Sequence, residues 1–139
     1  MNQDYQNHKR FHPLFHYILS LLIFITIVGA ICFVVRSGIS LPSILTLAIV
    51  IILAIMFVLI RQYPLKAQDR AIRAEENLRH YVLTGKLLDT RLTVGQIIAL
   101  RFADDAEFPA LTEKAVSQNL SPDDIKKQIT NWRADYFRI

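Results

Sequence analysis

Three histidines near the start of the chain have the spacing that most readily suggests chemistry. His8, His12 and His16 lie four residues apart in the stretch NHKRFHPLFHY, and this spacing stacks side chains on one face of a helix. Imidazoles arranged in this way could bind a metal ion or transfer protons. Pro13 weakens that interpretation, because it disfavours helical geometry at His12 and would clash with the carbonyl of Lys9. We therefore expect the histidines not to share one face, and a metal- or pH-responsive element remains an alternative.

Elsewhere the sequence offers no complete catalytic or metal-binding set. The stretch LTGK lacks the P-loop pattern, and FADDAEF lacks the ligand spacing of an EF-hand and reads as a solvated connection between helices. His80 lies on a charged stretch, where we expect it to be solvated or paired with Glu76. Cys32 is the only cysteine, so a disulfide within the chain is impossible. We predict that the protein is not an enzyme and uses no cofactor, no small-molecule substrate and no nucleic acid.

Two long uncharged runs determine the architecture around these residues. Hydrophobic residues make up 53% of the chain, and the runs Leu14–Val35 and Ser37–Ile60 contain no Asp, Glu, Lys or Arg. Each exceeds the ~20 helical residues that cross a bilayer. The first run is too long for a signal peptide and lacks a small-residue cleavage site. We therefore predict two retained transmembrane helices, with an exposed Arg36 between them.

Basic residues at the ends of the runs predict the topology. Lys9 and Arg10 precede the first run, and Arg61 and Lys66 follow the second, whereas the connection RSGIS carries one arginine. Positive residues remain on the cytoplasmic side. We therefore expect a lead-in at residues 1–12, a transmembrane hairpin at 13–62, a cytoplasmic domain at 63–139, and both termini in the cytoplasm.

Aromatic and basic residues at the ends of the runs are typical membrane-interface anchors. We assign this role to Lys9, Arg10, His12, His16, Tyr17, Arg61 and Tyr63. No charged residue lies within either run, which argues against a pump or a voltage sensor. A small homo-oligomeric pore lined by Ser20, Thr26 and Thr46 remains an alternative.

The cytoplasmic part has the patterns of short helices and no strand pattern. We expect Pro64 to kink or break the chain's helix, and a helix to run from residue 65 to about 84, where Gly85 ends it. Thr93 and Gln96 form a capping box for the next helix. A third helix follows near Pro109. The last begins at Ser121 and places Ile125, Ile129, Trp132 and Tyr136 on one face. The fold class is therefore all-α, with a small bundle of about four helices after the hairpin.

One apolar seam runs along the first of these cytoplasmic helices. Its members alternate steps of four and three residues: Ala67, Ala71, Ala74, Leu78 and Tyr81, hereafter the 67–81 seam. The spacing matches the a and d positions of a coiled coil. Packing of the seam on the helices that follow is the simpler interpretation, and an oligomer interface is the alternative. The intervening RAEENLR is expected to be a solvated face.

The chain resembles a known family in three stretches. These are NHKRFHPLFHY before the hairpin, QDRAIRAEENLRHYVLTGKLLDTRLTVGQIIALRFADDAEFPAL, and SPDDIKKQITNWRADYFR. They resemble an uncharacterised bacterial family, a domain of unknown function, of small two-span membrane proteins with a helical cytoplasmic C-terminal domain. The resemblance implies the bacterial inner membrane as the location. It implies no activity, cofactor or functional residue.

These observations together predict a function of the interaction class. We expect an integral membrane protein whose cytoplasmic helical domain serves as a protein-interaction or scaffold module and forms an oligomer. Its expected partners are the lipid bilayer, a further copy of the chain, or another protein. The pore and the histidine-based element are the alternatives.

Overall fold

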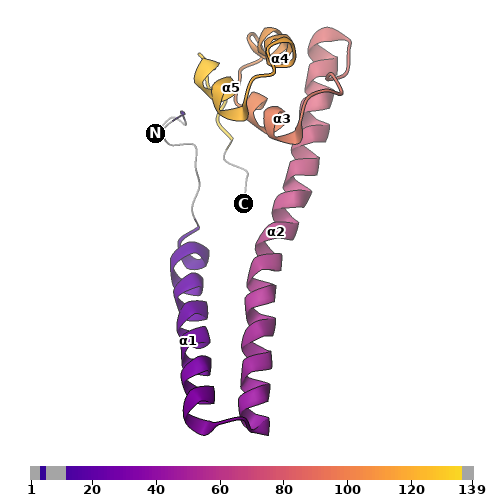
Figure 1. The fold of residues 1–139 in the computed structure, drawn as a ribbon. Helices are drawn as coiled ribbons and strands as arrows, with labels where there is room; N and C mark the ends of the chain where they lie inside the picture. Colours follow the sequence, from indigo (N-terminus) through magenta and orange to yellow (C-terminus); the bar gives the residue numbers. More distant parts are fainter. Residues whose placement is uncertain (1–3, 6–11, 136–139) are drawn as a thin grey trace. The chain divides into compact units, whose positions relative to one another are not determined.

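The computed structural model describes residues 4–5 and 12–135, and within these ranges the regular structure is helical, without a strand. In chain order, the elements are the π-helical segment η1 (Leu14–Leu19), α1 (Ser20–Ser37), α2 (Leu41–Thr84), α3 (Val94–Leu100), α4 (Phe108–Ser117) and α5 (Pro122–Gln128) (Figure 1). The all-α prediction is confirmed for this part of the chain. The described residues fall into two compact units, 12–64 and 65–135 with residues 4 and 5; the second is called the C-terminal unit below.

The first helix begins at Pro13, as its sequence predicts. The carbonyl of His12 accepts hydrogen bonds from the amides of Phe15, at 3.1 Å, and His16, at 2.9 Å. Proline suits this position because the first amides of a helix have no partner within it. The helix ends at Gly38, whose φ of 69° and ψ of −173° lie in a region open essentially to glycine.

A short turn leads from Gly38 into α2. The Ser43 hydroxyl donates a hydrogen bond of 2.8 Å to the carbonyl of Gly38, and Ser43 is buried. Pro42 lies in the first turn of α2, as expected. Pro64 does not end the helix: α2 continues through it to Thr84. The helix tolerates a residue that lacks an amide hydrogen and costs about 3 kcal/mol in a helix interior.

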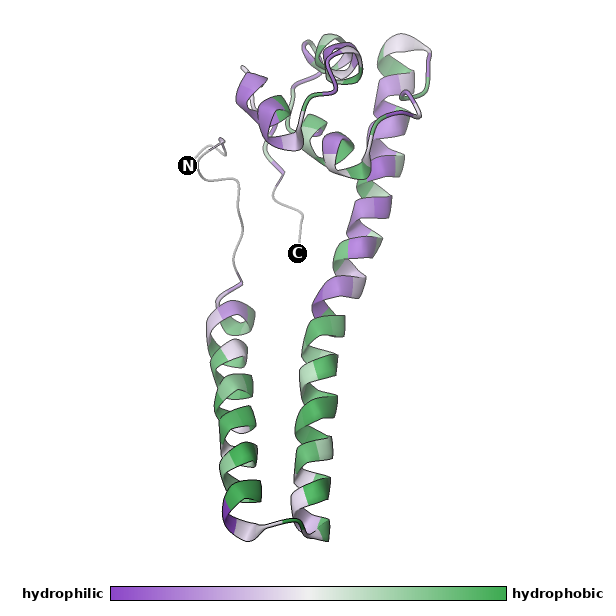
Figure 2. Cartoon of the chain, in the orientation of Figure 1, coloured by the Kyte–Doolittle hydropathy of each residue, from purple (hydrophilic) through white to green (hydrophobic). Residues whose placement is uncertain are grey.

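Two helices are long and apolar enough to cross a membrane. They are the 24-residue helix Leu14–Ser37 and the 44-residue α2, and only 6% and 11% of their most apolar windows are buried. Figure 2 shows α1 and the first part of α2 as hydrophobic, and the rest of α2 as largely hydrophilic. The rings of Phe15 and Phe57 stack with their centroids 4.7 Å apart. The prediction of two helices of membrane-spanning length is confirmed by their length and composition.

The C-terminal unit has a hydrophobic core built by α3, α4, α5 and the segments between them. Its largest fully buried side chains are Phe102, Phe108, Leu100 and Ile125. Trp132 packs against this core, with its ring centroid 5.0 Å from that of Phe102.

Two of the predicted helix starts are formed as the sequence indicates. The Thr93 hydroxyl accepts from the amide of Gln96, and the Gln96 side chain accepts from the amide of Thr93 at 2.8 Å, which completes the capping box. At α5, the Ser121 hydroxyl accepts from the amide of Asp124 at 3.1 Å. These bonds satisfy amides that the helix itself leaves unpaired.

The last helix is shorter than its sequence pattern predicts. It ends at Gln128, and Ile129 has extended backbone angles. The chain then runs alongside the α3–α4 connection, where Trp132 forms an isolated bridge with Ala103. Ile129 is buried and Trp132 partly buried, so both contribute to the core as expected, but without a continuous helix. Tyr136, expected on the same face, lies outside the described residues.

Candidate interaction surface

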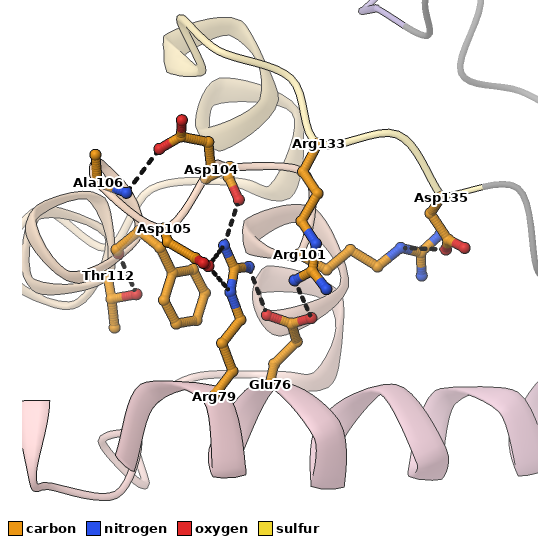
Figure 3. Close-up of polar contacts among 11 residues, drawn as sticks. Glu76, Arg79, Arg101, Asp104, Asp105, Ala106, Thr112, Arg133 and Asp135 are labelled. Carbon is orange, nitrogen blue, oxygen red and sulfur yellow. Dashed lines mark hydrogen bonds and ion pairs between the residues drawn. The ribbon is translucent and has the colours of Figure 1, made fainter. Parts of the chain in front are cut away.

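Arg79 is the centre of a polar network that fixes the end of α2 to the rest of the C-terminal unit (Figure 3). Its guanidinium donates to Glu76 at 2.9 Å, to Asp105 at 2.7 Å and to the carbonyl of Ala103 at 2.8 Å. The same group lies 4.3 Å from the centroid of the Phe108 ring. The planar five-donor group of arginine suits this arrangement, since one side chain can bind several acceptors at once. The expectation that RAEENLR is a solvated face is therefore wrong for Glu76 and Arg79.

Glu76 and the last described residues extend this network. Glu76 is 6% exposed and also faces Arg133, whose guanidinium lies 3.9 Å from its second carboxylate oxygen. Arg101 forms an ion pair with Asp135 at 3.0 Å and lies over the Phe102 ring. A hollow of about 270 Å³ lies beside these groups. Of its charged lining, Glu76, Arg101, Arg133 and Asp135 are engaged in pairs within the chain, which suits a structural role, whereas Glu75 lines it as an exposed residue.

His80 is expected to be solvated or paired with Glu76, and the structure shows that it is buried. It is 8% exposed, and its ring meets that of Phe108 edge-on. Its Nδ1 lies 2.7 Å from the carbonyl of Lys86; because a carbonyl only accepts, this nitrogen carries the proton. The bond closes the turn after α2. His80 also lines a hollow of about 520 Å³ together with Asp89 and Arg91, which pair with each other at 2.7 Å.

The acidic stretch FADDAEF organises the backbone around it. The Asp104 carboxylate accepts from the amide of Ala106 at 2.6 Å. Glu107 accepts from the amides of Thr130 and Asn131, at 3.1 and 3.2 Å. Asp105 pairs with Arg79. The stretch is a connection between helices as expected, yet its carboxylates are engaged within the fold. Within residues 4–5 and 12–135, no three His, Cys, Asp or Glu side chains gather as a metal site would require.

The 67–81 seam does not pack on the helices that follow. All five of its residues are exposed, Leu78 at 63% and Tyr81 at 53%. The face of α2 that does pack carries Ile72, Glu76 and His80, which are all buried. The simpler interpretation of the seam is therefore wrong. Residues four apart share a helix face, and α2 has two such faces: a mostly polar one that packs within the unit and an apolar one that is exposed.

Five of the seven expected membrane-interface residues lie among the described residues. Tyr17 and Tyr63 are 64% and 61% exposed, and the Arg61 guanidinium lies 5.6 Å from the centroid of the Phe15 ring. His16 turns back toward the helix start, with its Nδ1 3.1 Å from the backbone nitrogen of His12. His12 itself is exposed at the helix start. Lys9 and Arg10, together with His8, lie outside the described residues.

Two of the hydroxyls considered for a pore bond to their own helix. Ser20 donates to the carbonyl of Phe15 at 3.0 Å, and Thr26 donates to that of Leu22 at 2.7 Å. Hydroxyls in apolar helices commonly satisfy themselves in this way. Thr46 is half-buried.

Tyr5 makes a contact that sequence patterns do not indicate. Its hydroxyl donates a 2.8 Å hydrogen bond to Asp123 in α5, and Lys127 lies 5.9 Å from its ring centroid. The bond to Asp123 raises the pKa of the Tyr5 hydroxyl. The bond from Lys127, followed by that from Tyr5, lowers the pKa of Asp123. The two ends of the described chain, separated by both apolar helices, thus meet in one unit.

Comparisons with known proteins place the chain within one group. A family model described as a family of unknown function (DUF6526) matches residues 1–139. No curated protein and no solved structure matches the chain significantly.

Proposed function

We propose a function for this chain, which belongs to the family of unknown function DUF6526, from the surfaces that its fold leaves exposed. It is a non-enzymatic membrane protein whose C-terminal unit binds another protein through the 67–81 seam. The observation that carries this proposal is the exposure of Leu78 and Tyr81 on a helix whose opposite face is already packed. Fully burying a leucine side chain contributes about 1.5–3 kcal/mol, so this face favours a partner.

The membrane location rests on the two apolar helices. Exposed residues along them include Phe24, Ile25, Ile49 and Ile51, and an apolar surface of this extent suits lipid rather than water. The location proposed is the inner membrane of a bacterium. The stacked rings of Phe15 and Phe57 support an antiparallel hairpin.

The proposed topology places both termini in the cytoplasm. The contact between Tyr5 and Asp123 supports it, because residues before and after two spans can meet only if both lie on the same side. The basic residues that flank the spans favour the cytoplasmic side.

Cysteine labelling tests the topology. In a Cys32→Ser background, Ile39→Cys and Ser117→Cys each introduce a single exposed thiol. A membrane-impermeant maleimide added to intact spheroplasts should label position 39 and should reach position 117 only after permeabilisation. Equal labelling of both positions before permeabilisation would refute the proposed topology.

Photo-crosslinking tests the interaction. A photoreactive amino acid at Leu78 should give a covalent protein adduct in native membranes, whereas the same group at Lys114, exposed on α4, should not. An adduct can contain another copy of the chain or a different protein, and either supports the proposed function. The absence of any adduct at Leu78, in a chain that remains folded and membrane-bound, would contradict it.

A further inference from the structure

The 67–81 seam has the pattern of a coiled-coil interface, and the rest of α2 is arranged to match. Ala71 and Leu78 occupy a positions, and Ala67, Ala74 and Tyr81 occupy d positions. At a g position, Asn77 accepts a hydrogen bond from the amide of Leu88 at 2.9 Å. The other residues that pack within the C-terminal unit lie at b, c and f, which are the outer positions of a coiled coil. These are Ile72, Glu76, Arg79 and His80. The unit therefore covers the back of the helix and leaves its a/d side open.

The charges beside the seam identify the partner. Arg70 lies at a g position and Glu75 at the following e position, and both are exposed. In a parallel, in-register pair of helices, a g residue faces the e residue five positions later on the partner, and such pairs select partner and orientation. Arg70 of each copy would then face Glu75 of the other. The sequence of one helix thus carries both halves of a complementary pair.

An antiparallel pair offers no such match. It brings g positions opposite g positions and e positions opposite e positions. The g residues are Arg70, Asn77 and Thr84, and the e residues are Gln68, Glu75 and Val82. Neither set contains opposite charges, so Arg70 and Glu75 would gain nothing. The seam is thus self-complementary in the parallel arrangement only.

The small side chains of the seam also favour a second copy of the same helix. Alanines at three of the five positions allow two helix backbones to approach toward the short end of the usual 8–10 Å range. Leu78 and Tyr81 then supply apolar and aromatic area at the far end. In the proposed membrane topology, α2 of every copy leaves the bilayer in the same direction, which imposes the parallel orientation.

We propose that the 67–81 seam joins two copies of this chain in a parallel, in-register pair, with Arg70 of each copy facing Glu75 of the other. This inference rests on the proposed function and names its partner. The C-terminal units lie on the outer sides of the paired helices.

Disulfide crosslinking tests the register of the pair. In the Cys32→Ser background, Ala74→Cys places a thiol at a d position. In the proposed pair, the Cα atoms of the two copies at this position lie within the 4.4–6.8 Å separation that a disulfide allows. Mild oxidation of native membranes should convert it to a covalent dimer. Arg73→Cys is the matched control, because Arg73 is the exposed neighbour of Ala74 and lies at a position that faces away from the partner. This variant should remain largely monomeric after oxidation. Equal crosslinking at both positions would overturn the inference.

A charge exchange tests the pairing itself. Arg70→Glu or Glu75→Arg alone places like charges opposite each other at both 70/75 pairs of the dimer. Because two exposed pairs become repulsive, each single variant should weaken dimerisation of the full chain in lipid about 10-fold. The double variant, and a mixture of the two single variants, should regain the wild-type level. Unchanged Trp132 fluorescence would show that the variants fold. Equal weakening by the singles and the double would overturn the proposed pairing.

The Leu78 photo-adduct separates this inference from the proposed function. An adduct between two differently tagged copies supports both. An adduct that contains only a different protein would overturn the paired arrangement and leave the interaction function standing. No adduct would contradict both.

Discussion

Arg79 connects parts of the C-terminal unit that lie far apart in the sequence. Asp105 is 26 residues away and Ala103 is 24 residues away. Glu75 lies four residues before Arg79, but the structure pairs Arg79 with Glu76, three residues earlier. Both spacings are reachable on a helix. The position of Asp105 and the Ala103 carbonyl decides between them, and this is a tertiary fact that no local pattern contains.

Replacing Arg79 should destabilise the C-terminal unit. Arg79→Ala leaves the buried Glu76 carboxylate with one fewer partner. We expect the free energy of unfolding to fall by about 3 kcal/mol. Fluorescence of the chain's single tryptophan, Trp132, can follow unfolding in detergent micelles. Arg73→Ala, exposed on the same helix, is the control and should change stability by less than about 0.5 kcal/mol. Equal effects of the two changes would refute the role of Arg79.

Asp89 should retain its charge to unusually low pH. Hydrogen bonds from the Arg91 side chain and amide lower the pKa of Asp89 from 3.8 to about 2. Because the folded-state pKa lies below the ordinary value, the contribution to stability is present above pH 3.8 and is lost as pH falls toward 2. NMR titration of the Asp89 side chain should show this pKa. In Arg91→Ala it should return toward 3.8, and an unchanged value would contradict the assignment.

The histidines show how local rules succeed and fail at single residues. The proline rule places the helix start at Pro13 correctly, because it depends only on neighbouring backbone atoms. The burial of His80 depends on Phe108 and the Lys86 carbonyl, which the sequence places on other elements. The burial of His80 therefore cannot be inferred from its own helix.

The starts of α3 and α5 agree with the sequence prediction, whereas the end of α5 does not. The starts of α3 and α5 are set by Thr93 and Ser121 through bonds that span three residues. The end of α5 is set by distant groups. Glu107 takes the amides of Thr130 and Asn131, and Phe102 accepts the amide of Arg133 at 2.7 Å. These bonds take the place of the backbone bonds that a longer α5 would make. The spacing of Ile125, Ile129 and Trp132 would by itself allow that longer helix.

The capping box should contribute measurably to the stability of α3. Thr93→Ala removes the hydroxyl that accepts from the Gln96 amide at 3.3 Å, and we expect a loss of about 1 kcal/mol. Thr90→Ala, an exposed threonine in the preceding turn, should have little effect. Chemical denaturation of the two variants, followed by Trp132 fluorescence, makes the comparison. A loss at Thr90 as large as that at Thr93 would argue against a specific cap.

The seam shows the limit of periodicity at the level of a whole helix. Its spacing correctly identifies one continuous apolar face of α2, but spacing alone does not say what covers that face. Packing on the following helices is the simpler expectation from sequence, because apolar faces usually pack within the chain. The packed face of α2 instead combines Ile72 with charged and polar residues whose partners lie beyond residue 84.

At the scale of the molecule, the sequence predicts two apolar helices and an all-α fold, because hydropathy and the absence of strand patterns suffice for both. The contact of Tyr5 with Asp123 has no sequence signal.

In the proposed topology a short bifunctional maleimide should join Tyr5→Cys to Asp123→Cys within one chain in the Cys32→Ser background. Tyr5→Cys with Ile39→Cys should give no such product, because the bilayer separates them. Gel mobility and mass spectrometry after proteolysis distinguish these outcomes, and equal yields from both pairs would count against the topology.

The bond between Tyr5 and Asp123 also has a consequence for how the chain is made. Its partners are 118 residues apart, and synthesis proceeds from the N-terminus. Tyr5 therefore leaves the ribosome long before its partner exists, and both apolar helices, α3 and α4 must be synthesised in between. The contact can form only after α5 has been synthesised.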